Sequence, residues 1–154
     1  MAYTHTQDGI LQCELCPHRC RIAEGKHGVC GVRYNRSEEL SLPLYGVLSA
    51  VSNDPVEKKP LYHFYPGSSI FSVGFYGCSF RCPFCQNFRI AHQVPDSGRS
   101  VPPEELARRA AEEGAIAIAY TYSEPLVHFE WVRDAAREAK RLGLKNVLVS
   151  NGFI

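Results

Sequence analysis

The sequence predicts an α/β fold in which parallel strands alternate with helices. Three short segments are expected to be strands: residues 69–76 are rich in strand formers, residues 115–120 form a continuous apolar run, and residues 144–149 follow as the third. A helical pattern that ends in glycine, at Gly114 and at Gly143, separates each segment from the next. The order strand, helix, strand, helix, strand favours parallel pairing with right-handed crossovers.

Size, composition and charge argue against several classes of protein, namely nucleic-acid-binding, secreted and membrane-spanning proteins. The chain has 154 residues, of which 45% are hydrophobic, and this suits one ordinary domain or a small domain with part of a larger one. A net charge of +1 without a basic run argues against nucleic acid as a partner. The polar start lacks the apolar core of a signal peptide, and no segment has membrane-spanning length. We therefore expect a cytoplasmic protein without a membrane partner.

Four of the seven cysteines lie near the start of the chain in the spacing C-x2-C-x3-C-x9-C: Cys13, Cys16, Cys20 and Cys30. Seven cysteines cannot all form disulfides within the chain, because one would stay unpaired. In a reducing compartment, metal binding is the more usual role of clustered cysteines. We expect a metal here, zinc or a second [4Fe-4S] cluster, in a structural or electron-relay role. It would order a segment with little apolar content. The alternative is a disordered leader with free surface thiols.

The segment between this leader and the first long strand is expected to contain edge β-structure and turns. Residues 40–51 are rich in strand formers but carry Pro43 and Gly46, which indicates an edge strand or hairpin. Residues 53–55 (Asn-Asp-Pro) predict a turn, and residues 57–60 (Glu-Lys-Lys-Pro) are typical of a solvated turn.

Two amphipathic helices are expected between the strands. Ser100 is the candidate N-cap of the first, whose first turn carries two prolines and two glutamates. Inward-facing residues should recur at three- and four-residue steps. The predicted inward positions are Leu106, Ala110 and Ala111 in the first helix and Leu126, Phe129, Val132, Ala136 and Ala139 in the second.

The remaining three thiols form a loop directly after the first long strand. Cys78, Cys82 and Cys85 have the spacing C-x3-C-x2-C, and thiolates are soft ligands suited to iron–sulfur clusters or zinc. Three ligands would leave one iron of a four-iron cluster open, and open metal sites tend to be catalytic. A zinc knuckle would need a distant fourth ligand such as His92, and structural thiols or disulfides are a further alternative.

Polar motifs follow all three predicted strands. The cysteine loop follows the first strand, residues 122–125 (Tyr-Ser-Glu-Pro) follow the second, and residues 150–152 (Ser-Asn-Gly) follow the third. Because the carboxyl ends of parallel strands meet at one edge of a sheet, we expect a single composite site there. Taken separately, Glu124 suits a helix N-terminus and residues 150–152 suit an ordinary turn.

These motifs resemble those of the radical S-adenosylmethionine (SAM) superfamily. The loop matches its C-x3-C-x-aromatic-C signature, with Phe84 in the aromatic position that packs near the adenine. A closer resemblance is carried by residues 13–20 (Cys-x2-Cys-Pro-His-Arg-Cys), 54–61 (Asp-Pro-Val-Glu-Lys-Lys-Pro-Leu) and 120–125 (Tyr-Thr-Tyr-Ser-Glu-Pro). With them, nearly the whole chain resembles the AmmeMemoRadiSam-system radical SAM enzymes, relatives of pyruvate formate-lyase-activating enzyme. This resemblance favours a role at the mouth of the site for residues 57–60, beside their interpretation as a solvated turn.

The resemblance implies an enzyme in which Cys78, Cys82 and Cys85 hold a [4Fe-4S] cluster. The cluster would reductively cleave SAM to methionine and a 5′-deoxyadenosyl radical, which abstracts hydrogen from an unknown small-molecule or protein substrate. An electron donor such as flavodoxin or ferredoxin is implied as a partner. No catalytic residue is implied beyond the cluster ligands, and the implied SAM-binding residues are Phe84, Tyr122, Ser123, Glu124, Ser150 and Asn151.

Two departures separate the chain from the activating enzymes proper. Tyr122 and Ser123 replace the glycines of a Gly-Gly-Glu-Pro motif whose backbone receives the SAM ammonium group, and Val149 stands where aspartate is usual. Glycyl-radical-enzyme activation is therefore kept as an alternative function. The alternative of another class is a non-catalytic iron–sulfur or zinc-binding module for electron transfer or interaction. Such a module needs neither an open iron nor polar motifs at successive strand ends.

The resemblance also implies an architecture. A radical SAM barrel has about six strand–helix units, which alternate as in other α/β barrels. We therefore expect a Cys-rich leader with a short β segment at residues 1–66 and the first half of a partial (β/α)6 barrel at residues 67–154. Residues 144–149 would then be an unpaired edge prone to association, and residues 1–154 alone would be a poor catalyst. The alternative is a natural half-barrel closed by dimerisation.

Overall fold

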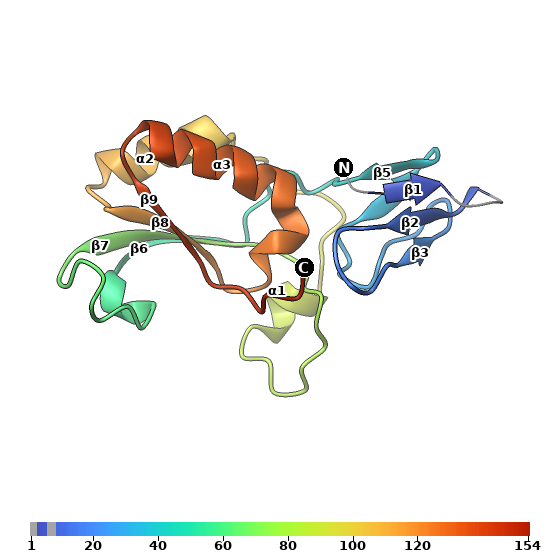
Figure 1. Ribbon diagram of the computed structural model, residues 1–154, viewed down its shortest axis with the longest axis horizontal. Helices are drawn as coiled ribbons and strands as arrows, with labels where there is room; N and C mark the ends of the chain where they lie inside the picture. The colour runs from blue at the N-terminus through green and yellow to red at the C-terminus, as the bar shows by residue number, and fades with distance from the viewer. Residues whose placement is uncertain (1–2, 6–8) are drawn as a thin grey trace.

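The body of the protein is a four-stranded sheet with two helices on one face (Figure 1). The computed structural model describes residues 3–5 and 9–154. The sheet has the order β6 (Ala50–Pro55), β7 (Ser69–Gly74), β8 (Ala117–Thr121) and β9 (Lys145–Leu148). β7, β8 and β9 are parallel to one another, and β6 pairs antiparallel with β7. The parallel β-α-β-α-β unit predicted from the sequence is confirmed.

The two central strands are buried on both faces. Every residue of β8 is buried, and in β7 every residue after Ser69 is buried. On one face Phe71 and Ile118 meet the helices, and on the other Ile70 and Ala117 pack with residues of the segment that follows β6. This two-sided burial explains why residues 115–120 are continuously apolar in the sequence and why the only polar side chains of β7 are two serines.

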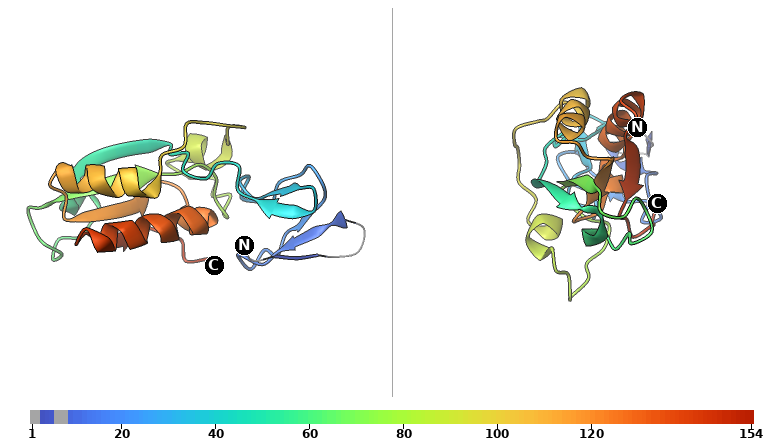
Figure 2. Two further views of the ribbon diagram at one scale, coloured as in Figure 1. Left: turned by 90° about the horizontal axis from the view of Figure 1, so that it is seen from above. Right: turned by 90° about the vertical axis from the view of Figure 1, so that its left-hand side faces the viewer.

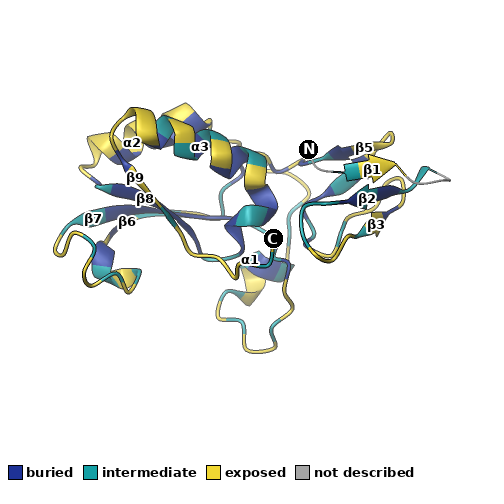
Figure 3. Cartoon of the chain, viewed as in Figure 1, coloured by how far each residue is buried: buried dark blue, intermediate teal, exposed yellow. Residues whose placement is uncertain are grey.

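Two helices cover the same face of the sheet side by side (Figure 2). α2 (Pro103–Glu112) connects β7 to β8, and α3 (Phe129–Arg141) connects β8 to β9. Buried residues gather where these helices meet β7 and β8 (Figure 3), and Trp131 lies at this contact with no exposed surface. A short helix, α1 (Phe88–His92), follows the cysteine loop. No helix in the described ranges is long and apolar enough to cross a membrane.

The ends of these helices agree in part with the prediction. Each is followed by a glycine with positive φ, Gly114 and Gly143, as predicted. Ser100 is not the N-cap of α2, which is Pro102; the Ser100 hydroxyl instead donates to the Tyr45 carbonyl oxygen at 2.8 Å. A proline in the first turn has a preset φ and no N–H to satisfy, so this helix begins without a side-chain cap.

The inward face of α2 is shifted from the predicted one. Leu106 and Ala110 are buried, as predicted. Ala111 is exposed, and Ala107 lies in the core in its place. Small residues occur on both sides of the apolar stripe, so periodicity alone did not identify the one that meets the sheet.

The predicted stripe of α3 lies between the core and an open groove. Val132 and Ala139 are buried, as predicted, but Trp131 and Ala135 form the centre of the core-facing side. Phe129 is 43% exposed. The other predicted inward residues line an apolar groove beside β9: Leu126, Phe129 and Ala136. Leu126 precedes α3 and lies in the 3₁₀ helix η3 (Pro125–His128).

Residues 53–55 form the end of β6 and not a turn. Asn53 pairs with Phe71 and Pro55 with Ser69 in the antiparallel ladder, and the chain turns afterwards in a 3₁₀ helix, η2 (Val56–Lys58). β6 is an edge strand, where a proline without an N–H is tolerated. β6 therefore belongs to the predicted leader, residues 1–66, by sequence, but it pairs with β7 of the predicted half-barrel, residues 67–154. The division at residue 66 stays a prediction.

The leader forms two small antiparallel sheets at the other end of the molecule (Figure 1). They are β1 (Tyr3–His5), β2 (Leu11–Cys13) and β3 (Arg21–Ile22), and the hairpin of β4 (Tyr34–Arg36) and β5 (Glu39–Ser41). An apolar cluster of Leu11, Cys13, Ile22 and Leu40 is buried between them. The leader therefore has a small core of its own, which the sequence analysis did not foresee. The edge strand or hairpin predicted for residues 40–51 corresponds to parts of β5 and β6.

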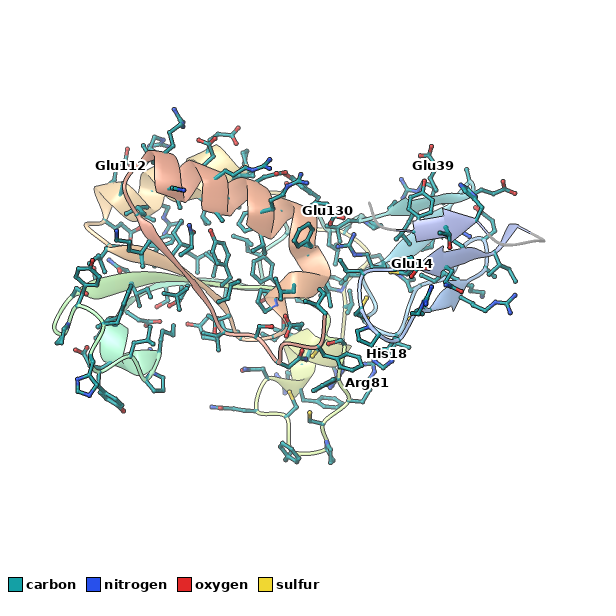
Figure 4. All side chains as sticks on the ribbon, in the orientation of Figure 1. Glu14, His18, Glu39, Arg81, Glu112 and Glu130 are labelled. Atoms are coloured by element: carbon teal, nitrogen blue, oxygen red, sulfur yellow. The ribbon has the colours of Figure 1, made fainter. Side chains whose placement is uncertain are left out.

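One buried ion pair joins the leader to the body. Arg33, whose side chain is 2% exposed, donates to both carboxylate oxygens of Glu130 at 2.9 and 2.7 Å and to the Val127 carbonyl oxygen at 3.0 Å. Glu130 lies at the start of α3, where that helix faces the leader (Figure 4). Burial disfavours the charged carboxylate, but the Arg33 guanidinium outweighs burial and lowers the pKa of Glu130. This bidentate pair holds the leader against α3.

We predict that Glu130→Gln lowers the free energy of unfolding by about 2–4 kcal/mol, because it leaves the Arg33 charge buried without its partner. Since the folded pKa of Glu130 lies below its ordinary value of 4.5, the stabilisation is present above pH 4.5 and is lost as pH falls through the folded pKa. Urea unfolding of parent and variant at pH 7 and at pH 3 measures both effects. Glu113→Gln, which breaks an exposed pair with Arg109, is the control and should cost less than about 1 kcal/mol. Equal losses in the two variants would contradict a role for burial.

Candidate functional site

The three thiols of the cysteine loop lie between the end of β7 and α1, on a loop that projects from the sheet (Figure 1). All three are half-buried and free. Burial raises the pKa of the Cys78 thiol, and the nearby charges of Glu124, Cys85 and Cys82 raise it further. Phe84, between the second and third thiols, is 86% exposed. The loop therefore presents three sulfur donors and an open aromatic ring to solvent.

These donors fit a soft metal centre better than a hard one. Three thiols of one loop interact electrostatically, and a metal that takes up thiolates would remove the charge repulsion that raises the pKa of Cys78. Within residues 3–5 and 9–154, no three His, Cys, Asp or Glu side chains already lie in a metal-holding geometry. His92, the distant zinc ligand considered above, hydrogen-bonds through Nδ1 with the Arg81 guanidinium at 2.7 Å. A cation at that nitrogen disfavours a metal there.

Glu124 connects the end of β8 to the end of β9. It is 3% exposed, and its Oε1 accepts from the Ser150 hydroxyl and from the Leu126 N–H, both at 2.9 Å. Its Oε2 accepts from the Asn151 N–H at 2.7 Å. A buried carboxylate needs such donors to offset its lost hydration. The residue is therefore both a cap for the first turn after β8 and an anchor for residues 150–152.

Asn151 and Ser123 complete the connection to the cysteine loop. Asn151 Nδ2 donates to the Ser79 hydroxyl at 3.0 Å and lies 4.0 Å from Cys78 Sγ. The Ser123 hydroxyl donates to the Phe75 carbonyl oxygen at 3.0 Å, which ties the end of β8 to the end of β7. These contacts confirm that the three polar motifs share one edge of the sheet, which is called the rim below.

Tyr122 has a backbone conformation that is unusual for its residue type. Its φ is +70°, in the left-handed region that glycine adopts without strain. The Asn87 amide donates to the Tyr122 carbonyl oxygen, and the Tyr122 hydroxyl donates to Asp54 Oδ2 at 3.2 Å. Both ends of the residue are therefore held. A tyrosine can keep a glycine-like backbone here because the side chain is anchored.

Asp54 is a functional candidate that the sequence analysis missed. It is 4% exposed, and it accepts from the hydroxyls of Ser52 and Ser72, both at 2.9 Å, and from the ammonium groups of Lys58 and Lys59 at 2.8 and 3.0 Å. Burial disfavours the charged form, but these donors together lower the pKa of Asp54 far below its usual value. The charged stretch at residues 57–60 was interpreted as a solvated turn, whereas the Lys59 side chain is only 6% exposed. The signal in the sequence was an aspartate in a strand four and five residues before two lysines.

The leader contacts the cysteine loop directly. His18 Nε2 donates to the Ser79 carbonyl oxygen at 2.8 Å, and Arg81 donates to the Val29 carbonyl oxygen at 2.7 Å. His18 and Arg81 lie next to each other where the leader meets the loop (Figure 4). A Cβ atom at Gly77 would lie 2.5 Å from the Cys30 carbonyl oxygen, so this approach requires glycine.

The leader thiols are less uniform than the loop thiols. Cys13 and Cys30 are buried in two different apolar clusters, and Cys16 and Cys20 are half-buried. Burial raises the pKa of both Cys13 and Cys16. Cys20 Sγ accepts from the Val29 N–H at 3.4 Å. Through the contact between His18 and Ser79, the part of the leader that carries Cys16 and Cys20 lies against the cysteine loop.

Comparison with known proteins agrees with this arrangement. A family model described as the radical SAM superfamily matches residues 72–154, which contain the whole rim. The uncharacterized protein MJ0808 of Methanocaldococcus jannaschii is 39% identical over 156 aligned residues. The alignment covers 100% of this chain and 47% of the relative, so the chain spans about half the length of that protein. No solved structure matches the chain at a significant level.

We predict that Glu124→Gln loosens the rim, because one of its oxygens becomes an amino group that cannot accept a hydrogen bond. The variant should lose about 2 kcal/mol of unfolding free energy, and the N–H of Leu126 or of Asn151 should exchange faster with solvent. Urea unfolding and hydrogen exchange measure the two effects. Glu105→Gln, on the exposed side of α2, should change stability by less than about 0.5 kcal/mol. Parent-like exchange at both amides would show that Glu124 does not hold the rim.

Proposed function

Because the chain belongs to the radical SAM superfamily, we propose that its rim binds a [4Fe-4S] cluster and SAM and generates a radical that abstracts hydrogen from a second molecule. The observation that carries this proposal is the hydrogen-bonded path from Glu124 through Asn151 to Ser79 and Cys78. This path joins the cysteine loop to Glu124 and Asn151, which are not among the proposed cluster ligands. A site for a metal alone has no need of that path, whereas a site for a metal and a second ligand does.

In this proposal Cys78, Cys82 and Cys85 hold the cluster, and no fourth protein ligand is required. A cluster held by these residues would pass one electron from a flavodoxin or ferredoxin to the sulfonium of SAM, and the carbon–sulfur bond would break to give methionine and a 5′-deoxyadenosyl radical. The loop contributes the three thiolates and the exposed Phe84 ring, which is free to pack against an adenine. The leader shields one side of the loop through the His18 and Arg81 contacts.

The residues of the rim position SAM in this proposal. The backbone at Tyr122 and Ser123 receives the ammonium group, and Ser150 and Asn151 lie toward the ribose and methionine parts. Glu124 acts as a positioning residue, since both of its oxygens are already occupied by internal donors. The left-handed backbone at Tyr122 supports the role of Tyr122 and Ser123, because Tyr122 adopts the backbone conformation that a glycine at this position of the related motif would adopt without strain.

The motifs at residues 13–20, 54–61 and 120–125 support a closer placement among the AmmeMemoRadiSam-system enzymes. We propose that placement and leave glycyl-radical-enzyme activation as the alternative. The hydrogen donor is a small molecule or a protein, and a flavodoxin or ferredoxin supplies the electron.

We predict that Cys82→Ala abolishes production of 5′-deoxyadenosine, because an incomplete ligand set does not hold the cluster. The full chain is loaded with iron and sulfide without oxygen, reduced, and supplied with SAM. Iron content, visible absorbance and 5′-deoxyadenosine are measured for parent and variant, and the product of the variant should fall to the level of a reaction without protein. Ser97→Ala, in an exposed loop, should match the parent. A Cys82→Ala protein that still makes 5′-deoxyadenosine would overturn the assignment.

We also propose that Cys13, Cys16, Cys20 and Cys30 bind a second metal, zinc or a [4Fe-4S] cluster, in a structural or electron-relay role. The contact between His18 and Ser79 supports it, because it places this part of the leader against the cysteine loop. All four are free thiols, which are the ligands that either metal accepts.

We predict that changing these four cysteines to serine removes one metal site and loosens the leader, while the loop keeps its cluster. Elemental analysis for iron and zinc, together with limited proteolysis of the leader, measures both effects. The triple serine variant of the loop thiols is the reciprocal control and should lose only the other site. If the leader variant holds as much iron and zinc as the parent, there is no second site.

A further inference from the structure

A hollow beside the cysteine loop is lined by Tyr122 and Ser123 of the rim and by two lysines that have no role in the proposed function. Its volume is about 440 Å³. The lining contains two lysines, two amides and three hydroxyl-bearing residues, and it contains no acidic residue: Lys58, Lys59, Pro60, Gln86, Asn87, Thr121, Tyr122, Ser123 and Val149. Gln86 and Asn87 directly follow the last thiol of the loop. A small ligand in the hollow would therefore lie next to the proposed cluster.

The two lysines are held in different ways. Lys59 is nearly buried, donates to Asp54 Oδ2 at 3.0 Å, and has its Nζ 5.0 Å from the centre of the Tyr122 ring. Lys58 is 64% exposed and donates to Asp54 Oδ1 at 2.8 Å. An ammonium group has three N–H donors, so this contact leaves Lys58 with capacity for further acceptors.

The charges of this group do not balance. Asp54 contributes one negative charge and the two lysines contribute two positive charges, which leaves a net charge of +1. Both oxygens of Asp54 also accept from hydroxyl groups, those of Ser52, Ser72 and Tyr122, so its negative charge is widely shared. The excess positive charge is therefore available at the wall of the hollow.

The neighbouring carboxylates do not cancel it. Glu57 accepts from the Gly67 N–H at 2.8 Å and is absent from the lining. Glu124 is absent from the lining as well, and its oxygens accept from the donors of the rim. A fixed cation in a hollow lined with amide and hydroxyl groups is the composition of an anion site.

We infer that Lys58 and Lys59 form a subsite that binds a carboxylate or phosphate group of a ligand at the rim. This identification of the ligand rests on the proposed function, while the anion site rests on the lysines, the hollow and the charge balance alone. Two sources share this chemistry. One is the carboxylate of SAM itself, and the other is an anionic group on the molecule that loses hydrogen.

The test is equilibrium dialysis of the full chain against radiolabelled inorganic phosphate, with ionic strength kept constant by chloride. It needs neither iron nor SAM, so its outcome is independent of whether the proposed radical chemistry is correct. The parent should show one saturable site. Lys58→Met should weaken binding at least about tenfold, as expected for the loss of one charge-assisted hydrogen bond, and Lys58→Arg should restore it. Lys145→Met, which removes an exposed charge on β9, should bind phosphate as the parent does.

Either substitution takes one ammonium group from Asp54. Lys58 is chosen because its side chain is exposed and the nearly buried Lys59 still pairs with Asp54 in the variant, whereas Lys59→Met would remove the buried partner. In iron-loaded protein, competition of phosphate with SAM would identify the carboxylate of SAM as the occupant. Simultaneous binding of both would identify the second substrate. No saturable phosphate binding in the parent, or equal binding in Lys58→Met and parent, would overturn the inference.

Discussion

The buried carboxylate of Glu124 is the contact on which the rest of the site depends. Parallel strands bring their carboxyl ends to one edge of a sheet, but they do not by themselves hold the loops that follow. Glu124 receives donors from its own first turn and from the residues after β9, and Asn151 carries the connection on to Ser79 in the cysteine loop. Because each of these polar groups is satisfied by another, the three loops form one unit.

A second buried carboxylate, that of Asp54, is linked to the rim through Tyr122. Asp54 anchors the Tyr122 hydroxyl and two lysines, and Tyr122 is the residue whose left-handed backbone begins the motif that contains Glu124. The strand that carries Asp54 is antiparallel and lies at the edge of the sheet. The rim is therefore positioned by the three parallel strands and also by β6, and the same residues that hold Tyr122 place positive charge beside the cysteine loop.

Much of this arrangement could be predicted from the sequence. Strand-forming residues identified β7, and a continuous apolar run identified β8. Glycines marked the ends of α2 and α3, and the shared edge of parallel strands placed Glu124 and Asn151 together. The role of Asp54 could not be predicted, because residues 53–55 have turn composition and only tertiary contacts show which donors surround a strand aspartate. Likewise, the Arg33–Glu130 pair joins residues 97 positions apart, and no local pattern reveals such a contact.

The central claim is that one edge of the sheet binds both an iron–sulfur cluster and SAM. Electron paramagnetic resonance of the full chain, loaded with iron and sulfide and reduced without oxygen, tests it most directly, because the signal of a reduced cluster reports on its ligands. Adding SAM should change the spectrum of the parent protein. The double variant Ser150→Ala, Asn151→Ala should need a higher concentration of SAM for the same change. A reduced cluster whose spectrum is the same with and without saturating SAM would contradict the claim.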